Sequence, residues 1–439
     1  MIFGVGLLWK TTGTFAMSDI TVSLNGVLPY TAFLCILIAS FAKAGAVPFH
    51  SWLPDVAEDG PASVTAYLPA SLDKLLGIYL LMRISLDIFV MNSVSNTILL
   101  TVGAVTIVFA VLAALVQHDL KRLLGYHAVS QVGYMVLGIG TANPIGIAGG
   151  LFHMVNHALY KSCLFLGAGA IEKRTHTTDL SNLGGLSKYM PVTFLSFLIA
   201  SFAISGIPPL NGFFSKWMIY QGIIELGNGK NPLWIIWLIA AMFGGALTVA
   251  SFVKLIHAIF LSRASAKTIG VKEVGISMAL PMVILAAICI LFGVFALSIP
   301  ISLLIVPVIG KSISYIGTWS PDLATMFIIA AMALGVIVYL FVKPKRVRVV
   351  SPFIGGEDVK QLDRVTGTEF YNTIKEVKAL KGLYSKEEAH KFDIYDIGKR
   401  TITVFARFFQ KLHNGILPTY LIWCLLGMIA MFLILSLGK

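Results

Sequence analysis

The chain is dominated by apolar runs that are long enough to cross a membrane. A helix needs about 20 apolar residues to span the hydrocarbon core of a bilayer. Soluble domains carry about one-quarter charged residues, whereas only 12% of this chain is charged and 57% is hydrophobic. This excludes an ordinary water-soluble enzyme and predicts an all-α, polytopic bundle of transmembrane helices. The predicted spans are 27–48, 63–90, 97–117, 121–142, 146–171, 191–226, 233–262, 274–297, 322–342 and 417–437.

The sequence lacks the usual ligand patterns for a metal or a cofactor. The four cysteines stand singly in apolar runs without a CxxC pair: Cys35, Cys163, Cys289 and Cys424. This pattern disfavours an iron–sulfur or zinc–thiolate site. His153 and His157 have the i, i+4 spacing of metal ligands, but no HExxH glutamate and no acidic third ligand accompany them. These histidines therefore favour a proton relay or a hydrogen bond between helices, and we expect no cofactor in this chain.

The formal net charge of +12 lies mostly in the loops between apolar runs. Short cytoplasmic loops of membrane proteins carry an excess of Lys and Arg. One side of the predicted topology collects Lys121, Arg122, Lys173, Arg174, Lys188, Arg263, Lys267, Lys272 and the basic cluster 343–348. We therefore expect a multi-pass protein of the cell membrane with these loops in the cytoplasm, close to anionic lipid and not to nucleic acid. This topology requires residues 298–321, which Pro and Gly interrupt, to be an irregular connection that does not span.

A charged segment precedes the last apolar run. Apolar residues recur in it at near-helical spacing among basic residues: Phe392, Ile397, Val404, Phe405, Phe408 and Leu412. The pattern predicts an amphipathic helix over 392–412 that lies along a membrane or a partner surface. The alternative is a solvated loop with a chance apolar stripe. The predicted organisation has four parts. Residues 1–297 form a transmembrane core, and 298–350 form a connection with a further span and a basic cytoplasmic loop. Residues 351–416 form a cytoplasmic-side amphipathic segment, and 417–439 form a final anchor.

Ionisable residues inside the apolar runs are the candidate functional residues. A charge near the bilayer centre is costly unless it faces a partner or water. The candidates are Lys43, Asp73, Lys74, His153, His157, Lys161, Lys216 and Lys254. The spacing i, i+4, i+8 places His153, His157 and Lys161 on one helix face. Because burial disfavours a charged lysine and histidine titrates near neutrality, such a row can pass protons through intervening water.

Some of these residues also have a simpler interpretation. Lys254 lies near a helix end, where its side chain could reach the membrane interface. Asp73 could neutralise its neighbour Lys74 locally, although adjacent residues do not share a helix face. Several lysines at mid-span in successive helices are nevertheless difficult to explain by chance.

A short internal repeat marks two of the predicted spans. Residues 40–48 (SFAKAGAVP) and 201–209 (SFAISGIPP) both fit SFAxxGxxP, and an intramembrane lysine accompanies each copy, Lys43 and Lys216. Gly and Pro at these positions break a helix and release backbone groups that only a water-lined or protein-buried site can satisfy. An odd number of spans separates the copies, so we expect them to run in opposite directions, as in inverted-topology repeats with discontinuous helices.

Four segments of the chain together resemble the antiporter-like membrane subunits of the complex I superfamily. They are AKAGAVPFHSWLPDVAEDGPASVTAYLPASLDKLLGIYLLMR, DLKRLLGYHAVSQVGY, GGLFHMVNHALYKSCLFL and LGGLSKYMPVTFLSFLIASFAISGIPPLNGFFSKW. This family includes the proton-pumping chains of NADH:quinone oxidoreductase, the large subunits of Mrp-type sodium/proton antiporters, and their counterparts in membrane-bound hydrogenases and sulfane reductases. The segments occur in family order, and the resemblance covers residues 1–297.

The resemblance implies a central polar axis of lysines and histidines. Motif by motif, this axis consists of Lys43, Lys74, His153, His157, Lys161 and Lys216, with Lys254 at a position where relatives also carry a basic residue. The resemblance further implies that 392–412 is a lateral helix along the membrane arm and that the last span anchors it. SPFIGGE (351–357) and TGTEFYNTI (366–374) resemble the hydrogenase-type branch.

The start of the chain differs from the family pattern. Relatives carry several helices before the first full span of this chain, including one with a glutamate that pairs with the lysine at the position of Lys43. Residues 1–9 look like the end of a helix. We therefore expect another chain to pack against residues 1–90, supplying helices and a Glu or Asp for Lys43. The alternative is a vestigial first half, with the working path running from Lys74 to Lys216.

The resemblance implies a subunit that translocates protons, or sodium against protons, within a redox-driven hetero-oligomeric complex. Iron–sulfur clusters and redox chemistry would belong to partner subunits, and we expect no redox or hydrolytic chemistry in this chain itself. Two alternatives stay open. The chain could serve a stand-alone Mrp-type sodium/proton antiporter, or it could be a non-pumping structural clamp of the membrane arm.

Overall fold

The computed structural model describes residues 1–229, 231–317, 320–342, 371, 373–388, 393–413 and 415–437. The regular structure of these residues is helical apart from β1 (Val22–Ser23) and β2 (Phe89–Val90), which form one short parallel pair. The predicted all-α class is therefore confirmed. The chain divides into two compact units, Met1–Lys381 and Gly382–Lys439. The predicted basic cluster 343–348, the SPFIGGE segment and Phe392 lie outside the described residues.

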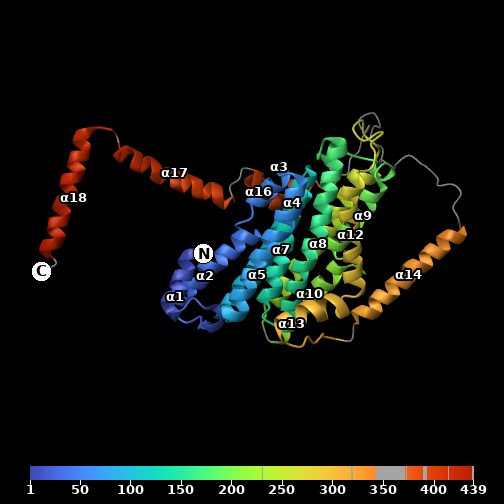
Figure 1. Cartoon of the computed structure of the whole chain (residues 1–439), viewed down its shortest axis with the longest axis horizontal. Coiled ribbons are helices and arrows are strands. Elements are labelled where there is room, and N and C mark those ends of the chain that lie inside the picture. Colours follow the sequence, from blue (N-terminus) through green and yellow to red (C-terminus); the bar gives the residue numbers. More distant parts are fainter. Residues whose placement is uncertain are drawn as a thin grey trace. The chain divides into compact units, whose positions relative to one another are not determined.

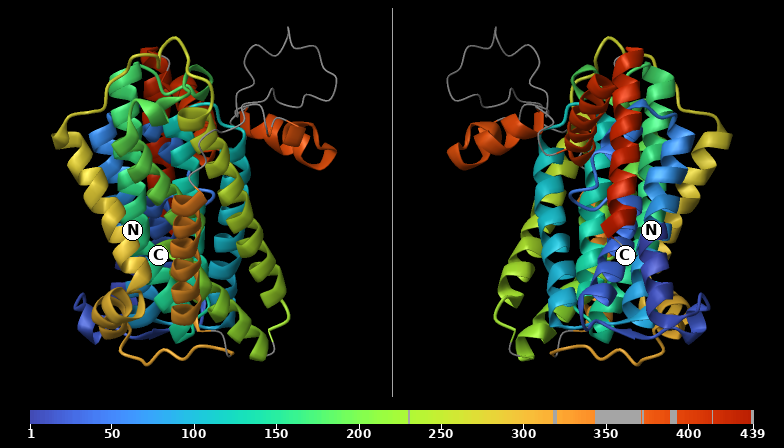
Figure 2. Two further views of the ribbon diagram at one scale, coloured as in Figure 1. Left: turned by 90° about the vertical axis from the view of Figure 1, so that its right-hand side faces the viewer. Right: turned by 90° about the vertical axis from the view of Figure 1, so that its left-hand side faces the viewer.

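The first unit is a bundle of helices joined by short connections (Figure 1). Its first helices are α1 (Ile2–Thr12), η1 (Met17–Asp19), α2 (Val27–Ala44), α3 (Trp52–Asp59), α4 (Ala62–Tyr67), η2 (Leu68–Leu72), α5 (Asp73–Arg83), η3 (Ile84–Ile88), α6 (Ser93–Leu115) and α7 (Leu120–Gly140). They are followed by α8 (Pro144–Thr175), η4 (Leu180–Asn182), η5 (Leu186–Lys188), α9 (Pro191–Ser205), α10 (Asn211–Asn228), α11 (Trp234–Ile256), η6 (His257–Leu261), α12 (Ile276–Val294), η7 (Leu297–Ile305), α13 (Val306–Ile309), α14 (Pro321–Val342) and α15 (Thr373–Glu376). The long helices of the bundle run roughly along one direction in both side views (Figure 2).

Seven helices within the described part of the chain are long and apolar enough to cross a membrane. They cover Val27–Ala44, Ala62–Ile88, Ser93–Leu115, Trp234–Leu261, Ile276–Val294, Asp322–Val342 and Leu417–Ser436. Three predicted spans are outside this group. The span 191–226 is divided between α9 and α10. The other two, α7 and α8, lie inside the bundle, where α7 is almost completely and α8 largely buried. A helix surrounded by protein needs no apolar outer face, so α7 and α8 can carry the polar side chains that lower their hydropathy.

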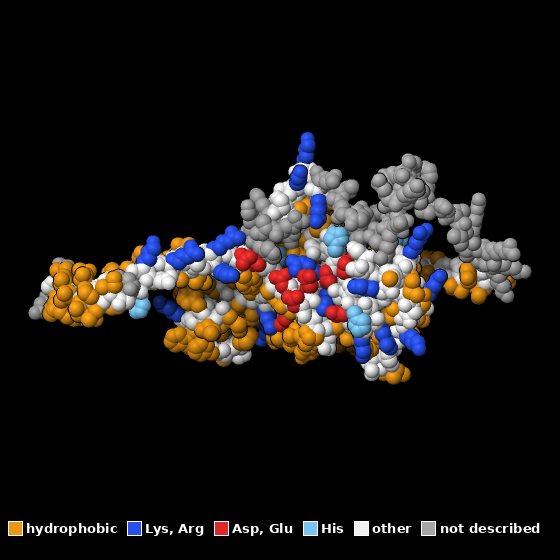
Figure 3. Space-filling view, turned by 90° about the horizontal axis from the view of Figure 1, so that it is seen from above, with side chains coloured by type: hydrophobic (Ala, Val, Ile, Leu, Met, Phe, Trp, Pro, Cys, Tyr) orange, Lys and Arg blue, Asp and Glu red, His pale blue; other side chains and the backbone are white. Residues whose placement is uncertain are grey.

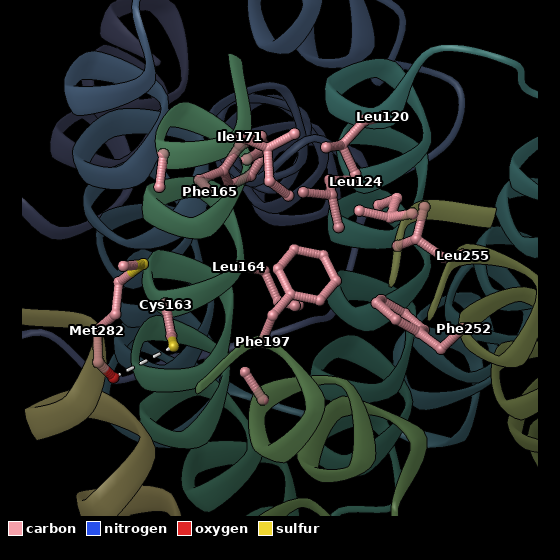
Figure 4. Close-up of a cluster of buried hydrophobic side chains, with 14 of the residues drawn as sticks. Leu120, Leu124, Cys163, Leu164, Phe165, Ile171, Phe197, Phe252, Leu255 and Met282 are labelled. Atoms are coloured by element: carbon pink, nitrogen blue, oxygen red, sulfur yellow. Dashed lines mark hydrogen bonds between the residues drawn. The ribbon is translucent and has the colours of Figure 1, made fainter. Parts of the chain in front are cut away.

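The interior is packed to backbone contact between α6 and α7. A side-chain carbon added at Gly103 would lie 2.8 Å from the carbonyl oxygen of Gly133, and one added at Gly133 would lie 2.7 Å from the carbonyl oxygen of Gly103. Beyond this contact, an apolar cluster fills the space between α7, α8, α9, α11 and α12 (Figure 4). In the cluster the Cys163 thiol donates a hydrogen bond to the carbonyl of Met282 at 3.4 Å.

Charged side chains gather at one end of the bundle, which we call the α3 end (Figure 3). Arg122, at the start of α7, pairs with Asp55 at 2.9 Å and Glu58 at 2.7 Å, both on α3. Lys121 pairs with Glu172, near the end of α8, at 3.2 Å. Such partly exposed pairs contribute about 1 kcal/mol or less each, but together they tie α3, α7 and α8 at this end.

The connection after α12 differs from the prediction. Residues 298–321 were predicted to be irregular, but η7 and α13 make Leu297–Ile309 helical. Pro307 lies in the first turn of α13, where a missing N–H costs no intrahelical bond, whereas Pro300 lies inside η7. Within the described part of this connection, Gly310–Gly317 and Ser320 lack regular structure. The segment Leu297–Ile309 is shorter than a span, in accord with a connection that stays on one side.

The second unit contains α17 (Ile394–Leu412) and α18 (Leu417–Leu437), and α16 (Lys378–Glu388) crosses the boundary between the units. The helix predicted over 392–412 is therefore present as α17, and the Asp393 carboxylate caps it by accepting a hydrogen bond from the Tyr395 N–H at 2.8 Å. Its apolar stripe is exposed, with Phe405 at 60% and Phe408 at 58%.

Candidate functional site

Helix α2 breaks at the first copy of the SFAxxGxxP repeat. Gly45 has φ of 82°, a left-handed conformation that suits glycine, and it ends the helix. The N–H groups of Gly45 and Ala46 both donate to the carbonyl of Phe41, at 2.8 and 3.0 Å. The peptide bond before Pro48 is cis, and the Phe49 N–H then donates to the Ala46 carbonyl at 2.7 Å.

Helix α9 breaks with the same local structure at the second copy. Gly206 has φ of 79°, and the Ile207 N–H donates to the Phe202 carbonyl at 3.0 Å. The peptide bond between Pro208 and Pro209 is cis. Helix α2 rises toward the α3 end, whereas α9 descends from it (Figure 1). The breaks and the opposite directions predicted from the repeat are therefore present.

A different donor satisfies a released carbonyl at each break. At the first break, the indole N–H of Trp52 donates to the carbonyl of Ala42 at 3.2 Å. At the second, the Nζ of Lys216 donates to the carbonyl of Ile204 at 2.8 Å. A side-chain carbon at Gly206 would lie 3.8 Å from this Nζ, so the ammonium group lies directly against the broken backbone.

The lysine buried at the first break is Lys74. Its side chain is 1% exposed, and a side-chain carbon at Gly45 would lie 3.6 Å from its Nζ. The Nζ lies 5.3 Å from the centre of the Trp52 ring, in cation–π range. It has no hydrogen-bonding partner among the described residues. A buried ammonium group requires a partner or water, so this position calls for internal hydration.

Lys43, unlike Lys74, is partly exposed, and it pairs with Asp73. The Lys43 side chain is 49% exposed, whereas the Asp73 side chain is 9% exposed. The expectation that this chain offers Lys43 no anion is therefore wrong, because α5 presents Asp73 to α2 across a close helix contact. The alternative in which Asp73 only neutralises Lys74 locally is also wrong, since its carboxylate reaches a lysine on another helix.

The three candidates on α8 are fully buried on one face, as predicted: His153, His157 and Lys161. His153 is held at both ring nitrogens, by the Ser215 hydroxyl at 2.9 Å and the Gln131 amide oxygen at 3.0 Å. Within the described part of the chain, the two ring nitrogens of His157 have no hydrogen-bonding partner, and the Nζ of Lys161 has none either. These positions therefore also call for internal water.

Helix α7 supplies polar residues that the sequence analysis did not single out. They are His127, Ser130, Gln131 and Tyr134, spaced i, i+3, i+4, i+7 and therefore on one face. The Tyr134 ring lies 4.9 Å from the Lys216 Nζ, and its hydroxyl donates to the carbonyl of Ala241 at 2.6 Å. The helical spacing of polar residues in YHAVSQVGY is the signal that could have identified this face.

Lys254 points into the protein. Its side chain is buried, and its Nζ donates to the carbonyls of Leu115 at 2.6 Å and Gln117 at 3.1 Å. These carbonyls lie at and just beyond the C-terminal end of α6, where backbone acceptors lack intrahelical donors and a cation is favourable. The interpretation that Lys254 reaches the membrane interface is therefore wrong.

The site is thus a row of buried lysines and histidines, which we call the central row, running from the first break across α8 to the second: Lys74, Lys161, His157, His153 and Lys216. Across the described ranges, no group of three or more His, Cys, Asp or Glu side chains could hold a metal ion. Lysine and histidine can each bind and release a proton. The chemistry available to this row is proton transfer through side chains and water.

These features define a multi-pass membrane protein with two broken helices and a buried polar axis. The chain belongs to the NADH:quinone oxidoreductase/Mrp antiporter family, whose transmembrane region matches residues 1–248. The resemblance indicated by the four sequence segments is confirmed.

The curated relatives include a hydrogenase component and an antiporter subunit. Hydrogenase-4 component B of Escherichia coli is 34% identical over 313 residues, which are 66% of this chain and 46% of the relative. A Na(+)/H(+) antiporter subunit of Alkalihalophilus pseudofirmus is 36% identical over 299 residues, which are 66% of this chain and 59% of the relative. The chain thus spans about half the length of the curated relatives it matches.

A solved structure extends the likeness in fold to nearly the whole chain. It is the membrane-bound sulfane sulfur reductase, an archaeal respiratory membrane complex. One of its chains matches with a TM-score of 0.78 at 24% identity, over 99% of this chain and 74% of that chain. At this identity the match concerns the fold alone.

The cap that Lys254 makes on α6 can be tested by Lys254→Met, which keeps the length of the side chain and removes its donors. Two buried carbonyls would lose a partner, so we expect a loss of about 1–3 kcal/mol in stability. The measurement is the thermal unfolding midpoint of the purified protein in detergent. Lys267→Met, on an exposed loop, is the control. Equal midpoints for both variants would show that Lys254 does not hold the end of α6.

Proposed function

We propose that this chain is an ion-translocating membrane subunit of a complex I-related assembly. It moves protons along an axis formed by Lys43, Lys74, the α8 cluster (His153, His157 and Lys161) and Lys216. The observation that carries this proposal is the position of Lys74 and Lys216. Each is buried beside the glycine that ends a broken helix. Ionisable groups that face the interior of a membrane bundle are costly to bury and mark ion pathways and proton relays.

The mechanism is electrostatic. Lys43 and Asp73 both act on Lys74, Lys74 acts on Lys161, and Lys216 acts on His153. In a low-dielectric interior, a change of charge at one member alters proton affinity at the next. A change in a neighbouring subunit that separates Lys43 from Asp73 would therefore alter the proton affinity of Lys74. A change of charge at Lys74 would in turn alter the proton affinities of the α8 residues His153, His157 and Lys161. Proton transfer through internal water then follows the change in affinity.

The redox energy would come from partner subunits, which would hold the iron–sulfur clusters. A stand-alone sodium/proton antiporter is the second candidate, and the relation to the antiporter protein of Alkalihalophilus pseudofirmus favours it. The two are distinguished by whether redox chains copurify with this chain. We place the basic α3 end in the cytoplasm of a cell-membrane protein, because loops that carry Lys and Arg stay on that side.

Replacement of Lys216 tests the axis. Lys216→Ala is expected to reduce ion transport by at least about tenfold, since it removes a proton-accepting group. It also removes the donor to the Ile204 carbonyl, so assembly of the variant complex is measured alongside transport. Lys216→Glu is expected to retain partial transport, because the resemblance implies that this position can hold either sign. The measurement is pH change in vesicles that contain the assembled complex, driven by substrate or by an imposed sodium gradient.

The control for this experiment is Lys267→Ala, which removes an exposed lysine. Transport at the parent rate by the Lys216→Ala complex would contradict the relay and support the alternative of a non-pumping structural clamp.

We further propose that α17 is a lateral helix that docks on the membrane arm through its apolar stripe. Replacing Phe405 and Phe408 with Asp is expected to loosen the chain from neighbouring subunits, since it places charge on the docking face. The matched control replaces Thr403 and Gln410, on the opposite face, with Asp. Native gel electrophoresis of the detergent-extracted complex measures the effect. Intact, coupled complexes from both double variants would contradict the docking role.

A partner chain is proposed to cover residues 1–90. The argument is the half-exposed Lys43 on α2, together with apolar residues exposed elsewhere on the same helix, such as Ile38 at 46%. A charged side chain at membrane depth is costly against lipid, so a partner with a polar or acidic face fits this surface. The partner could add a second carboxylate to the pair that Asp73 already makes with Lys43.

A photo-crosslinking residue at position 38 tests this contact. We expect Ile38 replaced by benzoylphenylalanine to crosslink to another chain of the complex, because the side chain faces outward. The same residue at the neighbouring Leu37, which is 2% exposed, is the control and should give no crosslink between chains. Products with lipid alone at position 38 would contradict the proposed partner.

A further inference from the structure

His127 on α7 is a buried histidine outside the central row. Its ring is 0% exposed, packs against Phe252 with ring centres 4.8 Å apart, and contacts the Ser251 hydroxyl through Nε2 at 2.7 Å. Ser251 is itself fully buried on α11. The other ring nitrogen, Nδ1, has no hydrogen-bonding partner among the residues that the structure describes. One side of the ring is therefore fixed, and the other is open to a donor.

The position of His127 connects two regions of the protein. Three buried lysines act on it electrostatically: Lys161 and Lys216 of the central row, and Lys254 on α11. His127 and Gln131 lie one turn apart on the same face of α7, and Gln131 bonds His153 of the row. The imidazole thus lies between the central row and α11.

Beyond His127, further polar groups lie on α11 toward the α3 end. Ser251 and Lys254 are three residues apart on α11, so they are neighbours on one helix face. The Nζ of Lys254 reaches the carbonyls of Leu115 and Gln117, where α6 ends. Gln117 is only partly buried, so this sequence of groups leads from the buried row to the surface of the bundle.

We propose that His127, Ser251 and Lys254 form a side branch that carries protons between the central row and the α3 end. The inference rests on the proposed ion translocation and names a route by which the row exchanges protons with that side. A proton delivered through water binds at Nδ1 of His127, and the proton on Nε2 passes to the Ser251 oxygen. The Ser251 hydroxyl gives its own proton to the amine of Lys254 in its neutral form, and the resulting ammonium group releases a proton to water at the end of α6. The imidazole and the hydroxyl each gain one proton and lose one, so both regain their charge.

A purely structural hydrogen bond between α7 and α11 is the competing explanation. The two explanations differ for His127→Gln, because a glutamine amide can still bond the Ser251 hydroxyl but cannot bind and release protons near neutral pH. A structural role predicts nearly unchanged transport in this variant. A relay role predicts a loss of transport with normal assembly and an altered dependence on pH.

The experiment uses the complete complex in vesicles, with proton movement followed by a pH-sensitive dye between about pH 5.5 and 8.5, a range that brackets the ordinary titration of histidine. We expect His127→Gln to lower the rate at least about tenfold, as for loss of a proton-transfer group. The residual rate should lose the pH dependence seen in the parent. His257→Gln, an exposed histidine on η6, is the matched control and should keep the parent rate and profile.

Two further variants separate the possible outcomes. Parent rate and pH profile in His127→Gln, together with an inactive Lys216→Ala, would overturn the branch and leave the proposed function intact. Parent rates in both would overturn the proposed function itself. Where His127→Gln fails to assemble, Ser251→Ala serves as the test, because it removes only a hydroxyl. A clear loss of rate in Ser251→Ala would support the branch, and the parent rate would overturn it.

Discussion

The constraint on which the rest of the structure depends is that a helix broken inside a membrane releases carbonyls that water cannot reach. In hydrocarbon each unsatisfied backbone group costs several kcal/mol, so a broken helix persists only where the protein supplies donors. The two breaks at Gly45 and Gly206 share one turn geometry, but their donors differ. Trp52 serves α2 with a neutral N–H, whereas Lys216 serves α9 with a group that also carries charge.

This difference gives the two halves of the bundle distinct properties. At the first break the donor and the buried lysine are separate residues, Trp52 and Lys74, and the lysine is free to respond to the Lys43–Asp73 pair without disturbing the helix end. At the second break Lys216 does both. A lysine still carries N–H donors when it is neutral, so it can lose its proton and keep the bond to Ile204.

Much of the fold could be predicted from the sequence, because span length, helix-breaking residues and helical spacing are local properties. The breaks at Gly45 and Gly206 and the shared face of the α8 residues are of this kind. The contacts of Lys43 and Lys254 could not be predicted, since Asp73 and the end of α6 approach them only through tertiary packing. His127 was overlooked for another reason. It lies in a run whose apolar residues resemble an ordinary span, although its polar face has clear helical spacing.

The backbone contact between α6 and α7 has a consequence for the geometry of the site. With Gly103 and Gly133 packed against each other's carbonyls, any larger residue at either position would push the two backbones apart. The spacing of α6 and α7 therefore depends on these two glycines. Because α7 also presents Gln131 and Tyr134 to the interior, this contact sets how far those side chains reach toward His153 and Lys216.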